Sequence, residues 1–175
     1  MKNAHINGYI NLSKLDLPIK TVARTDFQKN ILGLSTECKI VSSSINISDT
    51  EFKGTVIFFN CLFDTDARFK GATFSRNAEF MGATFSRNAE FMGATFSGNA
   101  VFEGATFNED TWFNGATFSG NAVFEGATFR YAGFEGATFS RNVGFRRATF
   151  SRNVGFRRAT FSGNAVFEGA TFNED

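Results

Sequence analysis

The sequence predicts an all-β solenoid, and three observations support this fold class. The eleven residues "GATFSRNAEFM" at positions 71–81 recur unchanged at 82–92, and variants of the same unit follow. Phe recurs in steps that alternate between six and five residues, from Phe52 to Phe129 and again from Phe145 to Phe172. The units combine Gly with β-branched Thr, and an α-helix of this period would carry both residue types in every turn at a large energetic cost.

Each half of the unit has the pattern of a very short strand followed by a turn. A small residue stands two positions before most of these Phe residues, as Ala83 does before Phe85, so both side chains point to the same side of an extended backbone. The residue between them, here Thr84, points outward. Only two or three residues then precede the next inward position, so the chain must turn at each unit. A chain that extends and turns without pause winds into a solenoid.

The repeated units resemble those of the pentapeptide-repeat family. Its signature is a small residue, then Asp, Asn or Thr, then Leu or Phe, then two polar positions, as in "ATFSR" and "AEFMG" here. The resemblance covers residues 50–175 continuously, with "INLSK" and "LDL" inside 10–17 and a further piece at 45–48. It implies a right-handed quadrilateral β-helix with four short strands per coil. A sixth residue in alternate units implies coils of 22 rather than 20 residues.

Two kinds of corner separate the predicted strands. Because Asn and Asp tolerate a left-handed backbone, we expect the extra residue to adopt one and to hydrogen-bond its own turn. That residue is Asn77, Asn88, Asn99, Asp110, Asn121, Asn142, Asn153 or Asn164. The alternate corner carries Gly, at positions 71, 82, 93, 104, 115, 126, 136 and 169.

Residues 22 apart are expected to stack between coils that lie ~4.8 Å apart. This spacing predicts four inner columns of Phe rings, which we expect to be the main source of stability because each buried Phe contributes about 1.5–3 kcal/mol. An interior filled with rings leaves no room for a cofactor, so we expect none.

The chain is expected to divide into a cap and a solenoid. Residues 1–46 form the cap, with a partial first coil and a loop or short helix, and residues 47–175 form the repeats without a C-terminal cap. Within the cap, Val22, Phe27, Ile31 and Leu34 are spaced to line one face of a short helix. The last unit stops partway, which predicts either a longer repeat protein or a homodimer formed by two copies meeting through the C-terminal coil.

The residue inventory favours a protein without catalytic activity. His5 is the only histidine and lies near the N-terminus, which argues against Ser-His, Cys-His and histidine-metal chemistry. Cys38 and Cys61 have no repeated spacing, so we expect buried thiols in a reducing compartment and no metal site. The sequence contains no apolar run of signal-peptide or membrane-spanning length, which predicts a soluble cytoplasmic protein without membrane contact.

Stacking also brings charged residues into outward columns. The stacking order runs Glu103, Glu125, Arg146 and Glu168 in one column, and places Glu135 beside Arg157 in a parallel one. Alternating charge of this kind favours a structural ladder over a catalytic pair of carboxylates.

Basic residues concentrate near the end of the repeats, although the net charge of the chain is only +1. The candidate partner-binding residues are Arg130, Arg141, Arg146, Arg147, Arg152, Arg157 and Arg158. Arginine recognises phosphate and acidic proteins, so a modulator of a topoisomerase or of a nucleic-acid complex, like the DNA mimics of this family, is one alternative. The chain lacks the acidic surface of such mimics, so we expect no contact with nucleic acid itself.

These observations favour a non-enzymatic scaffold that binds an unidentified protein partner. A third alternative is an ice-binding surface, because outward Thr and Ser form flat ladders, as Thr95 and Ser97 do.

Overall fold

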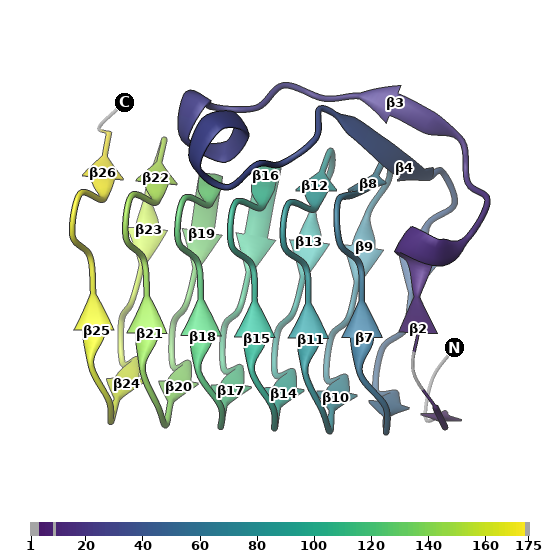
Figure 1. Ribbon diagram of the computed structural model, residues 1–175. Helices are drawn as coiled ribbons and strands as arrows, with labels where there is room; N and C mark the ends of the chain where they lie inside the picture. Colours follow the sequence, from purple (N-terminus) through teal and green to yellow (C-terminus); the bar gives the residue numbers. More distant parts are fainter. Residues whose placement is uncertain (1–3, 9, 174–175) are drawn as a thin grey trace.

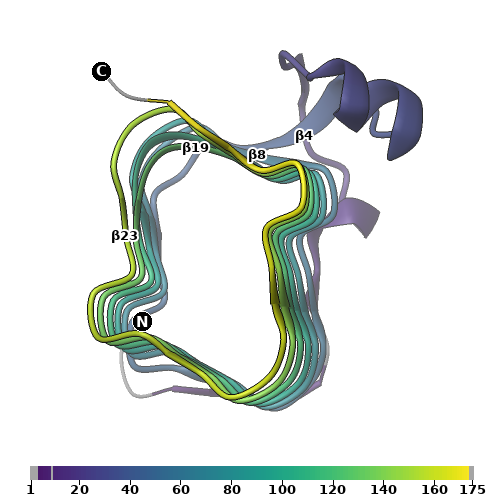
Figure 2. The same cartoon turned by 90° about the vertical axis from the view of Figure 1, so that its left-hand side faces the viewer.

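The computed structural model describes residues 4–8 and 10–173, which form a rod of stacked square coils (Figure 1). Each coil contributes one short strand to each of four faces, and neighbouring coils pair in parallel. In Figure 2 the C-terminal end faces the viewer and the chain passes from the top face to the left face while it advances toward the viewer. The coil is therefore right-handed, and the predicted fold class is confirmed.

The first and second faces are separate seven-stranded sheets. The first contains β1 (His5–Ile6), β6 (Glu51–Phe52), β10 (Thr73–Phe74), β14 (Thr95–Phe96), β17 (Thr117–Phe118), β20 (Thr138–Phe139) and β24 (Thr160–Phe161). The second contains β2 (Ile10–Asn11), β7 (Val56–Ile57), β11 (Ala78–Glu79), β15 (Ala100–Val101), β18 (Ala122–Val123), β21 (Val143–Gly144) and β25 (Ala165–Val166).

The third and fourth faces merge because β16 and β19 run around the corner between them. The third face contains β4 (Glu37–Val41), β8 (Cys61–Phe63), β12 (Thr84–Phe85), β16 (Thr106–Trp112), β19 (Thr128–Gly133), β22 (Thr149–Phe150) and β26 (Thr171–Phe172), with β3 (Ile19–Thr21) at its edge. The fourth face contains β5 (Ile45–Asn46), β9 (Ala67–Arg68), β13 (Ala89–Glu90) and β23 (Val154–Gly155), with the second halves of β16 and β19.

The register confirms coils of 22 residues with one exception. Thr73 pairs with Thr95 and Thr95 with Thr117, whereas Thr117 pairs with Thr138, one residue sooner. The register of β16 against β19 shifts after Phe107, so the missing residue is absorbed where these strands turn between the third and fourth faces.

Stacked phenylalanine rings fill the interior in four columns, as predicted. Rings of successive coils lie face to face, as Phe96 and Phe118 do at 4.9 Å and 3° between planes. Rings of adjacent columns meet edge to face, as Phe91 and Phe102 do at 5.4 Å and 82°. Both arrangements are favourable for aromatic quadrupoles. The columns are Phe52, Phe74, Phe96, Phe118, Phe139 and Phe161; Phe58, Phe80, Phe102, Phe124, Phe145 and Phe167; Phe63, Phe85, Phe107, Phe129, Phe150 and Phe172; and Phe69, Phe91, Phe113, Phe134 and Phe156.

The left-handed backbone lies at the Gly corners and not at the Asn corners. In the described part of the chain, the non-Gly residues with positive φ are Asp49, Asn60, Arg147 and Arg158. Each stands where other coils carry a corner Gly, such as Gly82 at φ 66°. The expectation that the extra Asn residues adopt this conformation is therefore wrong.

The extra Asn residues instead connect successive coils. The Oδ1 atom of Asn77 accepts a hydrogen bond of 3.1 Å from the backbone N–H of Asn99, and Oδ1 of Asn99 does the same for Asn121 at 3.1 Å. Asn142 and Asn164 repeat the contact at 3.1 Å. The bond thus spans two coils, and the prediction that Asn would bond its own turn is also wrong. Each amide satisfies a backbone donor that the short strands leave unpaired.

An insertion leaves the first coil at the corner between the second and third faces. His5 pairs with Glu51, 46 residues later, whereas Lys39 pairs with Cys61, 22 residues later. The first offset exceeds the second by 24, and we call these inserted residues, 13–36, the strap. The strap begins within the 3₁₀ turn η1 (Leu12–Lys14), continues through β3, antiparallel to β4, and turns back through the short π-helix η2 (Phe27–Ile31).

The strap lies along the outside of the rod, over one edge (Figures 1 and 2). Of the predicted apolar helix face, Leu34 is buried, but Ile31 is 69% exposed because η2 is a single short turn. At the other end of the rod, Phe172 is 54% exposed. Pairing of two copies through the C-terminal coil stays a prediction.

Removing one ring from a middle coil, Phe118→Ala, is expected to lower the free energy of unfolding by about 3–5 kcal/mol, because stacked neighbours on both sides prevent the cavity from collapsing. Thermal and denaturant unfolding measure the loss. Phe59→Ala is the control, since that ring is 42% exposed and its removal is expected to change stability by about 0.5 kcal/mol or less. Equal stability of Phe118→Ala and the parent protein would contradict the inward placement.

Candidate interaction surfaces

The strap packs onto a column of glycine corners that we call the covered corner. This column lies between the second and third faces and consists of Asn60, Gly82, Gly104, Gly126, Arg147 and Gly169. A Cβ atom on Gly104 would lie 2.6 Å from Leu34 Cδ1, and one on Gly126 would lie 2.4 Å from the ring of Phe27. The glycines therefore provide both the left-handed turn and the space into which strap side chains fit.

Two buried polar side chains of the strap hydrogen-bond the corner carbonyls. Arg24 Nη2 donates to Gly82 O at 2.5 Å and to Asn60 Oδ1 at 2.7 Å. Gln28 Nε2 donates to Gly104 O at 2.9 Å and to Gly126 O at 3.5 Å. Burial lowers the pKa of the Arg24 guanidinium from its ordinary value. The strap thus supplies donors to three successive coils.

Both cysteines are free and buried, as predicted. Arg24 Nη2 lies 3.1 Å from Cys38 Sγ, and burial raises the pKa of that thiol despite the nearby positive charge. Burial raises the pKa of Cys61 to about 12. Neither thiol has the electropositive, accessible surroundings of a reactive cysteine.

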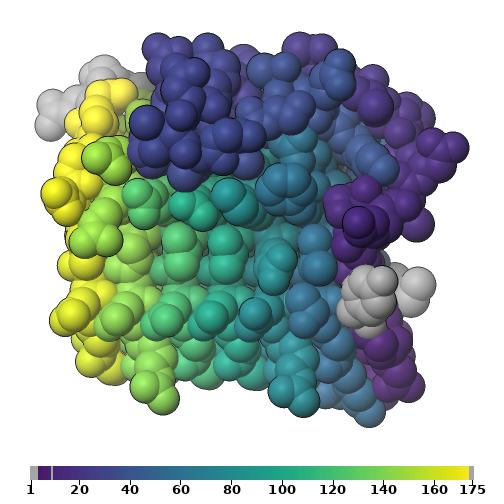
Figure 3. Space-filling model, in the orientation of Figure 1, coloured from purple at the N-terminus to yellow at the C-terminus, as the bar shows by residue number. Residues whose placement is uncertain are grey.

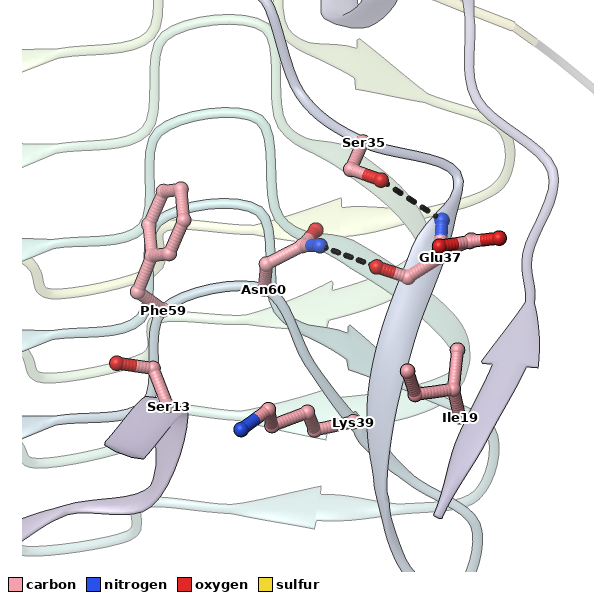
Figure 4. Close-up of a pocket in the computed structure, with 7 residues that line it drawn as sticks. All are labelled: Ser13, Ile19, Ser35, Glu37, Lys39, Phe59 and Asn60. Carbon is pink, nitrogen blue, oxygen red and sulfur yellow. Dashed lines mark hydrogen bonds between the residues drawn. The ribbon is translucent and has the colours of Figure 1, made fainter. Parts of the chain in front are cut away.

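A pocket of about 220 Å³ lies where the strap leaves the rod (Figure 4). Its lining residues are Ser13, Ile19, Ser35, Glu37, Lys39, Phe59 and Asn60. Its wall is held by Asn60 Nδ2, which donates to the carbonyl of Glu37 at 2.6 Å, and by the Glu37 N–H, which donates to Ser35 Oγ at 3.0 Å.

Exposed apolar side chains gather around this pocket. Ile19 is 62% exposed and Phe59 is 42% exposed, and both line it. Leu15 is 48% exposed, and its carbonyl accepts a hydrogen bond from Nζ of Lys39, another lining residue. We call Leu15, Ile19 and Phe59 the foot patch. The sequence analysis did not identify it, although Phe59 departs from the Phe spacing.

The structure distributes the seven candidate arginines over all four edges of the rod. Arg141 lies between the first and second faces, Arg146 and Arg147 at the covered corner, Arg130 and Arg152 between the third and fourth faces, and Arg157 and Arg158 between the fourth and first. Neighbours in sequence separate in this way because the chain turns a corner every five or six residues. The arginines therefore do not form one continuous surface.

Several of these arginines have partners within the protein. Arg146 Nε lies 3.1 Å from Glu168 Oε2, and Arg147 Nη1 lies 3.6 Å from Glu125 Oε1. Arg147 also places its guanidinium 5.1 Å from the ring centre of Phe27 on the strap. Arg130 pairs with Glu109, one coil below. These contacts hold coils and strap together, and the binding role of the seven residues stays a prediction.

The expected charge columns form only in part. Arg146 pairs with Glu168 as predicted. The expected pair of Glu135 with Arg157 is not among the ion pairs of residues 4–8 and 10–173, because the Glu135 carboxylate turns back over Gly133 and Gly155. Both glycines lack the Cβ that would exclude it: on Gly155 that atom would lie 1.9 Å from Glu135 Oε1.

The first face carries the expected ladder of outward threonines. Thr73, Thr95, Thr117, Thr138 and Thr160 are in register on successive strands. Ice binding by this ladder stays a prediction. Across residues 4–8 and 10–173, no group of three His, Cys, Asp or Glu side chains is arranged to hold a metal ion. No helix in the same residues is long and apolar enough to span a membrane.

Comparison with known families agrees with this geometry. A family model described as pentapeptide repeats (9 copies) matches residues 47–95, 91–138 and 134–175. The chain belongs to the pentapeptide-repeat family. No curated protein and no solved structure matches it. The strap of this pentapeptide-repeat protein lies outside the matched residues.

Glu103 is expected to destabilise the fold at neutral pH. Burial, and then the neighbouring Glu125, raise the pKa of Glu103 above its ordinary value. The folded state therefore disfavours the ionised form, and stability is lost as the pH rises above ~4.3, where the unfolded chain ionises. Glu103→Gln is expected to raise the melting temperature at pH 7 and to match the parent protein at pH 3. Glu79→Gln is the control, and an equal change in both variants at both pH values would contradict this account.

Proposed function

We propose that this pentapeptide-repeat protein is a non-enzymatic scaffold that holds a protein partner at the foot patch. The observation that carries the proposal is the gathering of Leu15, Ile19 and Phe59 around one pocket. The other large exposed apolar side chains of the described residues, Ile31 and Phe172, lie elsewhere on the strap and at the C-terminal coil. A local group of exposed apolar side chains with a polar rim is typical of protein interfaces.

The architecture supports this role. The interior is filled by phenylalanine, so binding groups can be placed only on the outside of the rod. The ring columns fix the spacing of the outer positions, so a bound partner meets a surface that needs little rearrangement. Glu37 and Lys39 line the rim of the pocket and provide one charge of each sign beside the apolar side chains. The match to the family supports the scaffold and does not identify the partner.

Photo-crosslinking is expected to locate the interface. A p-benzoylphenylalanine at position 59 is expected to form a discrete adduct in a lysate of the source cells. The same probe at position 31 is the control, because Ile31 is more exposed than Phe59 but lies away from the pocket. The adduct is expected to disappear when Ile19→Ser is added. Equal labelling from both positions, or none from position 59, would contradict the foot patch as the interface.

An anionic partner is the second candidate, since Arg141, Arg157 and Arg158 form no ion pair within the described residues. If these side chains bind phosphate groups, retention on phosphocellulose is expected to weaken with salt and to be lost when all three are changed to Asn. Asn suits position 158, where φ is 58°. Arg76→Asn with Arg87→Asn is the control. Equal retention of both variants would contradict a specific arginine site.

A further inference from the structure

The rod has a second column of glycine corners that nothing covers. This open corner lies between the fourth and first faces and consists of Asp49, Gly71, Gly93, Gly115, Gly136 and Arg158. Gly115 and Gly136 have φ 66°, within a few degrees of the 61° and 62° of Gly104 and Gly126. The backbone turn is the same, but Gly104 and Gly126 are buried whereas Gly115 and Gly136 are exposed.

The strap shows which chemistry a glycine corner accepts. Buried Arg24 and Gln28 donate hydrogen bonds to the carbonyls of the covered corner. Apolar side chains occupy the space that a Cβ would take: Leu34 Cδ2 would lie 2.9 Å from such an atom on Gly82, and the Phe27 ring 2.4 Å from one on Gly126. The covered corner is thus a groove with an intramolecular occupant.

The open corner presents the same groups without an occupant. A Cβ on Gly93, Gly115 or Gly136 would meet nothing within 4 Å. In the part of the chain that the structure describes, the carbonyls of these three glycines accept no hydrogen bond, unlike those of the covered corner.

Two side chains of the same corner also lack donors. Asn114 Oδ1 and Glu135 Oε2 are shielded from solvent and accept no hydrogen bond. Both converge on one position, since a Cβ on Gly133 would lie 2.4 Å from Asn114 Oδ1 and 2.9 Å from Glu135 Oε2. Unpaired acceptors of this kind are costly, and a donor from a ligand relieves the cost after a small side-chain movement.

We propose that the open corner, from Gly93 to Gly136, is a docking groove for a peptide segment with the chemistry of the strap. Arginine and glutamine side chains of the segment donate to the glycine carbonyls, and its apolar side chains lie over the glycines. The carboxylate of Glu135 favours a cationic segment, and Arg157 with Arg158 ends the groove by repelling one. This site is separate from the foot patch and goes beyond the scaffold function proposed above.

The strap sequence itself is the probe. A peptide of residues 22–34, "VARTDFQKNILGL", contains no Trp or Tyr, and Trp112 is the only Trp of the protein. Trp112 is the last residue of β16 on the fourth face, beside the open corner and diagonally across the rod from the strap (Figure 2). Titration of the peptide into the full chain is expected to change the Trp112 emission in a saturable way. A peptide with Ala at both the Arg24 and Gln28 positions is expected to bind at least tenfold more weakly.

Variants of the corner decide whether the groove is the site. Gly115→Asn is expected to fold, because Asn60 occupies an equivalent corner at φ 51°, and to weaken peptide binding at least tenfold by filling the groove. Gly93→Asp, based on Asp49 at φ 51°, is the second variant and is expected to act alike. A saturable response that both variants leave unchanged would overturn the proposal. So would a silent Trp112 with faster hydrogen exchange at residues 82–126, because the peptide would then be displacing the strap. Neither result depends on crosslinking at position 59.

Discussion

Face-to-face stacking of phenylalanine rings between coils is the interaction on which the rest of the structure depends. A ring in one coil finds its partner at about 5 Å only if the next coil places the same residue above it, which requires the repeat to keep its length. Strands of two residues form few backbone hydrogen bonds of their own, so side-chain stacking must fix the register. The corners then have to turn within two or three residues, which explains the left-handed glycines and the few residues that replace them.

The requirement for stacking divides the sequence into constrained and free positions. Inward Ala and Phe are buried almost without exception in the middle coils, whereas outward and corner positions vary from Glu to Val to Gly. Departures from the repeat therefore carry information about the surface. Phe27 and Phe59, the two phenylalanines outside the spacing, lie on the strap and in the pocket at its base. The strap itself converts one plain corner into an occupied groove and leaves the opposite corner open.

The sequence was sufficient to predict the features that repetition averages over many copies, and it failed where a single residue decides. The β-solenoid, the 22-residue coil, the inward residues and the four ring columns followed from periodicity. The role of the extra Asn was wrong because its amide reaches the next coil, and residue preferences for a turn contain no information about the neighbour above. The path of the strap was not predictable, since it depends on Arg24 and Gln28, which occur once. The arginine segment looked continuous in sequence, but each corner turns its members onto a different edge.

The distance along the rod tests the stacked architecture most directly. Spin labels at positions 51 and 160 on the first face, with Cys38→Ser and Cys61→Ala to remove the natural thiols, are separated by five strand-to-strand steps. At ~4.8 Å per step the account predicts a narrow distribution centred near ~24 Å between backbone positions, widened by the label linkers. A distribution that is broad, or that is centred beyond ~35 Å, would contradict coils held in register by their phenylalanine columns.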